Sequence, residues 1–242
     1  MQTLGKYFIF LGSLFTDRER FNVYVKLTFE EAVELGVNSL FIVSIISFFL
    51  GGVSAVQTAY QLTHPLLPQS LIGTLVRDMG ILELSPTITC IVLAGKVGSH
   101  IAGGLGTMRV TEQIDALEVM GINSASYLVL PKIIATLITF PALIIISAFL
   151  LIGGGYLAGV LTGALTPSEY IYGIQLDFIP FNVFFGLIKA TVFSFIISSI
   201  SSFKGYYTKG GALEVGKAST SAVTASCIGI LLADFLLAKL FL

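Results

Sequence analysis

Charge is scarce in this chain of 242 residues: Lys, Arg, Asp and Glu make up 11% of it, whereas hydrophobic residues make up 55%. A soluble domain of this length carries far more charge. With 13 basic and 14 acidic residues, there is no positive surplus to neutralise phosphates, which excludes nucleic-acid binding as a function. The mean hydropathy of +0.93 instead predicts an integral membrane protein.

Cysteine and histidine are also rare. The two cysteines, Cys90 and Cys227, fall inside apolar runs, where an isolated thiol is a small buried hydrophobe, and no disulfide is expected. The two histidines, His64 and His100, are far apart in sequence and have no suitably spaced ligands around them. We therefore expect neither a metal site nor a cofactor.

Five charge-poor segments are long enough to cross a bilayer, which predicts an all-α membrane protein. The expected spans cover approximately 36–56, 83–106, 131–155, 181–202 and 218–240. Because the third apolar run stays uncharged past Gly163, this span either ends near the glycines at 153–155 or continues as a longer, tilted helix. A further apolar piece, 66–76, is too short to cross, and we expect it to dip into the membrane or to lie on it.

The first 35 residues form an expected region of their own, 1–35, ahead of a membrane domain that covers 36–242. Apolar side chains recur in the first region at helical spacing: Phe21, Val25, Phe29, Ala32 and Val33. Such an amphipathic helix suits the membrane surface. The alternative is a helix packed against the spans.

Lysines and arginines near the ends of the spans predict the orientation. Nine lie on one side: Lys6, Arg18, Arg20, Lys26, Arg109, Lys132, Lys204, Lys209 and Lys217. The other side has Arg77 and Lys239. We therefore expect the amino terminus in the cytoplasm and the carboxyl terminus on the far side.

The stretch GTMRVTEQIDALEVMG, 106–121, is a local exception to the scarcity of charge. At helical spacing its apolar residues fall on one side: Val110, Ile114, Leu117 and Gly121. Its acids form a separate row: Glu112, Asp115 and Glu118. With Thr107 as a cap and Gly121 as a stop, we expect one short helix over 107–120 whose acidic edge faces a cytoplasmic partner. A solvated connecting helix is the alternative.

Small residues recur at every fourth position in two of the spans. One strip is Ala94, Gly98, Ala102 and Gly106, and the other is Gly155, Gly159 and Gly163. Such strips let helix backbones approach closely, so we expect helix packing at Gly98, Ala102, Gly155 and Gly159. The neighbouring helix can belong to the same subunit or to a second copy.

Two lysines lie inside spans, where a charge costs about 2.5 to 3.5 kcal/mol and needs a partner or a water-filled cavity. Lys96, with His100 one turn later on the same face, and Lys189 are candidate lipid-binding residues, because an ammonium pairs well with phosphate oxygens. The alternative is that Glu83 and Asp234 pair with these lysines, or with Arg77, for structural balance.

One motif imitates a nucleotide site. GALEVGKAS, starting at Gly211, is almost a phosphate-binding loop, but Ala218 occupies the position that requires Ser or Thr, and no strand precedes the loop. It is interpreted as a loop at the start of a helix.

The run LELSPTITCIVLAGKVGSHIAGGLGTMRVTEQIDALEVMGINSASYLVLPKIIA resembles the permease subunits of MlaE/YrbE-type ABC lipid transporters. That family carries a nearly identical GTMRVTEQIDALEVMG, followed by a tyrosine and a proline like Tyr127 and Pro131. KGGALEVGKASTSAVTAS, 209–226, resembles the family's second cytoplasmic loop, and the residues 232–235 resemble its ending. The resemblance covers most of the chain from about Gly36 onward.

The resemblance implies a homodimeric permease with five spans in the bacterial inner membrane, with its carboxyl terminus in the periplasm. It further implies two copies of a separate cytoplasmic ABC ATPase, an Mce-domain lipid-binding protein, and a phospholipid or related lipid as substrate. The chain itself would then be no enzyme. The charged stretch resembles a coupling helix, on which the ATPase would dock through Arg109, Glu112, Gln113, Asp115 and Glu118.

The sequence departs from the family at two positions. Family members commonly have an arginine before the glutamate that starts the second span and an acid near its cytoplasmic end, where this chain has Leu82 and Gly104. The resemblance therefore assigns no charge-based role at these positions.

Two other function classes compete with a permease. A membrane-embedded lipid-modifying enzyme would need clustered acids or a nucleophile beside a base, but the acids inside the spans are scattered, and Ser198, Ser199, Ser201 and Ser202 have no histidine nearby in sequence. An ion-coupled carrier would show repeated halves, and no internal repeat is evident. Dependence on a separate ATPase distinguishes the three.

Overall fold

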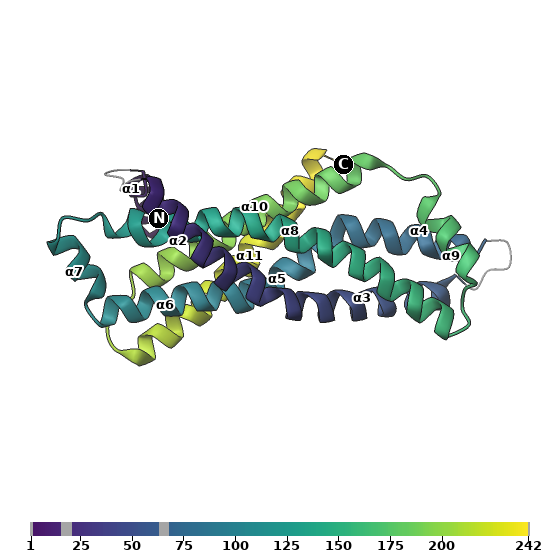
Figure 1. Cartoon of the computed structure of the whole chain (residues 1–242), viewed down its shortest axis with the longest axis horizontal. Coiled ribbons are helices and arrows are strands. Elements are labelled where there is room, and N and C mark those ends of the chain that lie inside the picture. Colours follow the sequence, from purple (N-terminus) through teal and green to yellow (C-terminus); the bar gives the residue numbers. More distant parts are fainter. Residues whose placement is uncertain (1, 16–20, 63–67, 242) are drawn as a thin grey trace. The chain divides into compact units, whose positions relative to one another are not determined.

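The computed structural model describes residues 2–15, 21–62 and 68–241, and these ranges are helical, with no strand among them. The helices are, in chain order, α1 Gln2–Ser13, α2 Phe21–Glu31, η1 Ala32–Gly36, η2 Val37–Ser39, α3 Leu40–Gln61, α4 Ser70–Met79, η3 Gly80–Ile88, α5 Thr89–Leu93, η4 Ala94–Gly98, α6 Ser99–Val110, α7 Gln113–Val119, α8 Ser124–Leu161, α9 Pro167–Gln175, α10 Pro180–Tyr206 and α11 Ala212–Phe241 (Figure 1). Three residues used above, Arg18, Arg20 and His64, lie outside the described residues.

Five continuous helices are long and apolar enough to cross a membrane, as predicted. They cover Phe21–Gln61, Ser70–Val110, Ser124–Leu161, Pro180–Tyr206 and Ala212–Phe241. The first joins α2, η1, η2 and α3 end to end, and the second joins α4, η3, α5, η4 and α6. The fold class is therefore confirmed as an all-α, multi-pass membrane protein.

The spans extend further than hydropathy indicated. The described part of the short apolar piece, 68–76, is not a separate element, because α4 continues into η3 without a break. The third span continues through the glycines at 153–155 to Leu161, and the chain turns at Gly163, whose φ is 70°. Hydropathy reports the apolar part of a helix only, whereas backbone hydrogen bonding continues into polar turns at both ends.

The chain forms two compact units. One unit combines Leu40–Thr89, Pro141–Ala190 and Leu240–Leu242. In its described part, α3 and α8 approach so closely that a methyl group at Gly51 would overlap the carbonyl of Leu151, and one at Gly154 would overlap that of Phe48. Only glycine fits at both contacts.

A small apolar core completes this unit around α4 and α9. Its buried members are Ala55, Ile72, Val76, Leu151, Leu165 and Tyr170. The hydroxyl of Thr74 donates to the carbonyl of Gly173 at 2.7 Å, which ties α4 to α9. At the start of α9, Thr166 and Glu169 form a capping box, and the hydrogen bonds from the hydroxyl and amide of Thr166 hold the pKa of Glu169 below its usual range.

The other unit combines Met1–Ser39, Cys90–Phe140 and Thr191–Lys239. Here α1 buries Phe10 in an aromatic cluster with Phe203, Tyr206 and Tyr207 of the α10 end, at centroid separations of 5.3 to 5.7 Å. The phenol of Tyr7 is partly buried as well and lies 2.7 Å from the hydroxyl of Ser199. Burial raises the pKa of Tyr7.

The amphipathic helix expected ahead of the first span is α2, and it contacts α8. The hydroxyls of Tyr24 and Ser126 lie 2.7 Å apart, and Glu31 forms an ion pair with Lys132. These contacts match the alternative of a helix packed against the spans. Its position at the membrane surface, and the division of the chain at residue 35, stay predictions.

Candidate functional site

The charged stretch forms two helices, which corrects the expectation of one helix over 107–120. Thr107 lies inside α6, where its hydroxyl donates to the carbonyl of Gly103 at 2.9 Å, so it is not a cap. The break falls at Thr111 and Glu112, and Glu112 has a φ of 60°. A non-glycine residue in this conformation interrupts a helix. The second span therefore projects to Val110, and α7 is a separate helix beyond it.

Arg109 connects the end of α6 to α7. Its guanidinium donates to a carboxylate oxygen of Asp115 at 2.7 Å and lies 3.9 Å from one of Glu118. Glu118 also accepts hydrogen bonds from the hydroxyls of Ser124, at 3.0 Å, and Tyr206, at 3.1 Å. Two members of the predicted acidic row thus bind residues of α6, α8 and α10 within the same unit.

The carboxyl end of α7 has the predicted glycine stop. Gly121 has a φ of 78°, the amide of Gly121 donates to the carbonyl of Glu118, and the amide of Ile122 donates to that of Leu117. This pair of hydrogen bonds is the Schellman motif, which closes a helix on a left-handed residue. On one side of α7, Ile114 is fully buried. The short helix is therefore fixed at both ends and along one side.

The exposed face of α7 carries two apolar side chains beside its acids. It consists of Glu112, Gln113, Ala116, Glu118, Val119 and Met120. The exposed fractions of Val119 and Met120 are 89% and 65%, which is high for apolar side chains beside a charged stretch. Sequence reasoning missed this apolar end because it considered only the acidic row. The sequence did contain a signal, because Val119 and Met120 are two consecutive apolar residues that do not fall on the predicted apolar side of the helix.

Lys189 lies inside the unit that contains α3 and α9, and its side chain is 0% exposed. Its ammonium forms an ion pair with Glu83 at 2.7 Å, donates to the carbonyl of Leu82 at 3.0 Å, and lies 5.0 Å from the ring centroid of Phe185. Glu83 is 47% exposed. The structure thus contains the ion pair that was the alternative to lipid contact, whereas a lipid-binding role of Lys189 stays a prediction.

Lys96 and His100 lie together on an exposed face, as their spacing indicated. The ammonium of Lys96 donates to the carbonyl of Asn38, and His100 lies 3.0 Å from a carboxylate oxygen of Glu34. Both contacts tie the second span to the η1 and η2 segments of the first span. Arg77, which the sequence offered as a further partner, donates instead to Asp78 and to carbonyls that follow α9. Asp234 is half-buried on α11.

Comparison with known proteins decides the family. A model of the family "Permease MlaE" matches residues 28–240. The chain belongs to the MlaE permease family. A probable ABC transporter permease protein of Rickettsia bellii is 41% identical over 240 residues, which cover 99% of this chain and 92% of the relative. A probable ABC transporter permease protein of Synechocystis is 33% identical over 239 residues, covering 99% and 90% of the two chains.

A plant relative of this MlaE permease carries a more specific name. The chloroplastic protein TRIGALACTOSYLDIACYLGLYCEROL 1 of Arabidopsis thaliana is 36% identical over 228 residues, which cover 90% of this chain and 62% of the relative. The matches to relatives from bacteria and from a chloroplast therefore cover nearly the whole of this chain. The expected family is confirmed by these matches.

The small residues of the MlaE permease lie at tight contacts. A methyl group at Gly98 would lie 3.0 Å from the hydroxyl of Ser201, and Ala102 is fully buried, with its carbonyl against Gly205. A methyl group at Gly155 would lie 2.5 Å from the hydroxyl of Tyr170, and one at Gly159 would lie 3.1 Å from Leu165. All four contacts lie within a single copy of the chain.

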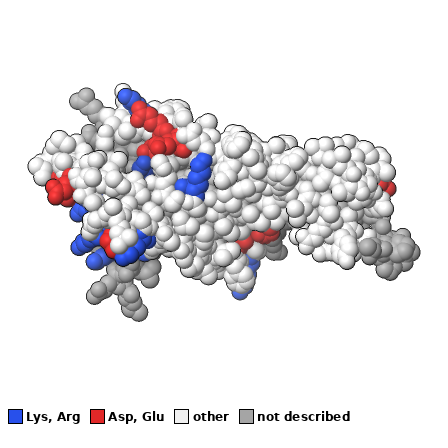
Figure 2. All heavy atoms as spheres, turned by 90° about the horizontal axis from the view of Figure 1, so that it is seen from below, with Lys and Arg blue, Asp and Glu red and all other residues white. Residues whose placement is uncertain are grey.

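The remaining motif of the permease is helical. GALEVGKAS spans the beginning of α11, where Lys217 pairs with Glu214 at 2.6 Å. In the described part of the chain, no group of three or more His, Cys, Asp or Glu side chains could hold a metal ion. Charged side chains are sparse across the face drawn in Figure 2, and other residues make up most of its surface.

Proposed function

We propose that this chain is the membrane subunit of an ABC transporter that moves phospholipids or related lipids between the inner membrane and the outer envelope. A separate cytoplasmic ATPase supplies the energy and docks on α7. An Mce-domain protein receives or delivers the lipid, and a second copy of the chain completes the membrane part. The amino terminus lies in the cytoplasm and the carboxyl terminus in the periplasm of a bacterial inner membrane.

The exposed face of α7 carries this proposal. Ion pairs and a buried isoleucine hold the helix firmly against its own unit, while Val119 and Met120 remain open to solvent. Exposed apolar side chains beside a few charges are typical of a protein interface. Membership of a family of ABC permeases supports an ATPase as the occupant. The docking role therefore extends from the predicted acids to Val119 and Met120.

Lipid as cargo is supported by the plant relative, whose name is that of a galactolipid. A second copy is supported by α11. Only 17% of its most apolar part is buried, and small or polar residues form an exposed stripe along the helix: Gly216, Thr220, Ser221 and Thr224. Stripes of this kind favour close helix packing in membranes.

Charge reversal and apolar-to-acid variants on α7 test the docking. We expect Glu112→Lys and Val119→Asp each to weaken ATPase binding by about tenfold or more, the effect of losing roughly 1.4 kcal/mol at the interface. Asp115→Lys is a poorer test, since Asp115 holds Arg109. Glu30→Lys on α2 is the matched control, because Glu30 is exposed as well. Copurification of the ATPase and its stimulated hydrolysis are the measurements.

Reconstitution tests the cargo and the competing classes. In vesicles that contain the permease, the ATPase and the Mce-domain protein, we expect movement of a fluorescent phospholipid that requires ATP and an intact α7. Movement that follows an ion gradient without the ATPase would establish a carrier instead. Chemical conversion of the lipid would establish an enzyme. Wild-type binding of the ATPase by Val119→Asp and Glu112→Lys would refute the docking site.

A further inference from the structure

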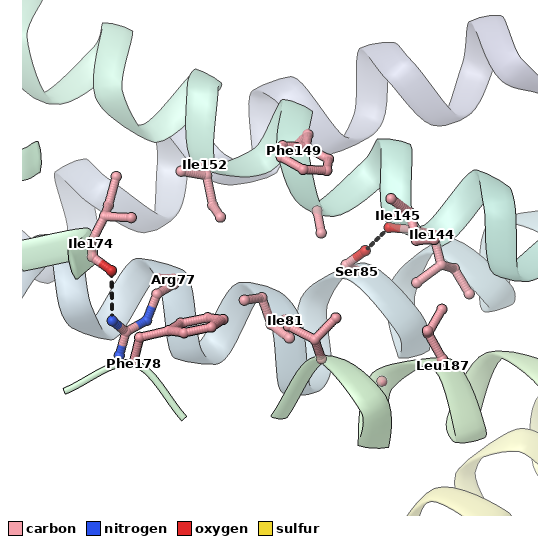
Figure 3. Close-up of a pocket in the computed structure, with 13 residues that line it drawn as sticks. Arg77, Ile81, Ser85, Ile144, Ile145, Phe149, Ile152, Ile174, Phe178 and Leu187 are labelled. Atoms are coloured by element: carbon pink, nitrogen blue, oxygen red, sulfur yellow. Dashed lines mark hydrogen bonds between the residues drawn. The ribbon is translucent and has the colours of Figure 1, made fainter. Parts of the chain in front are cut away.

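A cavity of about 220 Å³ lies within the unit that contains α3 and α9 (Figure 3). Its walls come from η3 and the end of α4, from the middle of α8, from the end of α9, and from the first turns of α10 together with the loop before it. Most lining side chains are apolar, among them Ile81, Ile144, Phe149 and Leu187. The cavity differs from the Glu83 and Lys189 pair, neither of which lines it.

The polar side chains of the lining are already satisfied by the protein. One nitrogen of Arg77 donates to the carbonyls of Ile174, at 2.7 Å, and Leu176, at 2.6 Å, and another donates to Asp78 at 2.8 Å. The hydroxyl of Ser85 donates to the carbonyl of Ile144 at 2.8 Å (Figure 3). A polar ligand or a water cluster would therefore find few partners. The occupant has to be apolar.

The mouth of the cavity is apolar too. Phe149 is 74% exposed, and Ile145, Phe178 and Val183 are exposed as well. Ile145 and Phe149 belong to the third span, which is long and apolar enough to cross the hydrocarbon of a bilayer. An opening lined by such side chains is continuous with the lipid-facing surface, so a hydrocarbon chain can enter it sideways without crossing a polar barrier.

Size supports the same occupant. Apolar cavities of about 150 Å³ stay dry and accept ligands as large as benzene. At 220 Å³ this cavity has room for a longer stretch of hydrocarbon, and an empty one would deprive its walls of dispersion contacts. In a membrane the abundant apolar ligand is the acyl chain of a lipid.

We propose that this cavity binds one acyl chain of a bilayer lipid, while the headgroup stays outside, beyond Phe149 and Val183. The site recognises hydrocarbon and not charge, because Arg77 is occupied by backbone carbonyls. The binding holds whether or not this lipid is the one transported, so it goes beyond the proposed function and can be tested without the ATPase.

Ala148 lines the cavity, which makes it the position for a filling variant. The permease is reconstituted in phosphatidylcholine vesicles with a small fraction of phosphatidylcholine that carries a diazirine near the end of one acyl chain. After illumination, labelled peptides are located by mass spectrometry. We expect labelling at 144–152 and 178–187, and a decrease of about tenfold in Ala148→Leu, the effect of displacing about two methylene groups of the chain.

Ala142→Leu is the matched control, since Ala142 is exposed on the same helix and does not line the cavity. Labelling of the exposed side of α3, at Phe41 and Phe49, reports ordinary surrounding lipid and should stay unchanged in every variant. Val183→Phe narrows the mouth from an exposed position and provides a second variant if Ala148→Leu is unstable. Labelling at 144–152 that is unchanged in both cavity variants, or confined to surface residues, would overturn the proposal.

Discussion

Pro86 lies one helical turn after Leu82, whose carbonyl accepts a hydrogen bond from Lys189. A proline has no N–H, so it cannot donate to the carbonyl of Leu82 four residues earlier. The helix takes a π form there, over Gly80–Ile88, and the ammonium of Lys189 donates to that carbonyl at 3.0 Å. A buried lysine thus has a carboxylate, a carbonyl and an aromatic ring as neighbours. This arrangement explains how an ammonium is tolerated inside a span.

Glu83→Ala should destabilise the fold by about 3 kcal/mol, because it leaves a buried charge without its carboxylate. Adding Lys189→Met in the same chain should recover most of that loss, since no buried charge then remains. Unfolding in detergent micelles, followed by circular dichroism, measures both variants. Lys239→Met, on an exposed lysine, is the control and should stay within about 0.5 kcal/mol of the original chain. If Glu83→Ala behaves like this control, the ion pair carries no stability.

The helical elements differ in how far sequence could predict them. Five spans follow from hydropathy because the bilayer sets a minimum apolar length, and Gly121 follows because a helix stop needs a left-handed residue. The π segments at 80–88 and 94–98 could not be predicted, since they depend on which side chains of other helices pack there. The partner of Lys189 was likewise open, because Glu83 lies 106 positions away in sequence.

Replacing glycine by alanine should change stability in opposite directions at Gly121, where α7 ends, and at Gly104 in α6. Gly121→Ala places a side chain at a φ of 78° and should cost about 1 kcal/mol. Gly104→Ala places the same methyl group in the middle of α6, where nothing lies within 4 Å, and should stabilise by a few tenths to about 1 kcal/mol. Thermal unfolding in micelles and hydrogen exchange of the α7 amides are the measurements. Equal effects of the two substitutions would contradict the assigned turn.

At the scale of the whole molecule, the distribution of charge predicts the orientation in the membrane. Most lysines and arginines lie in segments that are predicted to share one side of the membrane with α7. The segment between α8 and α10 has none. The positive-inside rule then assigns α7 to the cytoplasm and α9 to the opposite side. Hydropathy alone could not have made this assignment, because it is the same for both orientations.

Cysteine labelling measures the orientation directly. In a chain with Cys90→Ala and Cys227→Ala, Ser168→Cys on α9 should react with a membrane-impermeant maleimide in intact cells. Ala116→Cys on α7 should react only after the membrane is permeabilised, and both positions are exposed, so accessibility within the fold is matched. Labelling of Ala116→Cys in intact cells would reverse the orientation and remove the docking site from reach of an ATPase.

The contacts of α7 have a mechanical consequence. Arg109 of α6, Ser124 of α8 and Tyr206 of α10 all bind carboxylates of this one short helix. A tilt of α7 would therefore act on the ends of three membrane helices at once. Force applied to the exposed end of α7 would be transmitted to these three helices, whereas a flexible loop in the same place would absorb it.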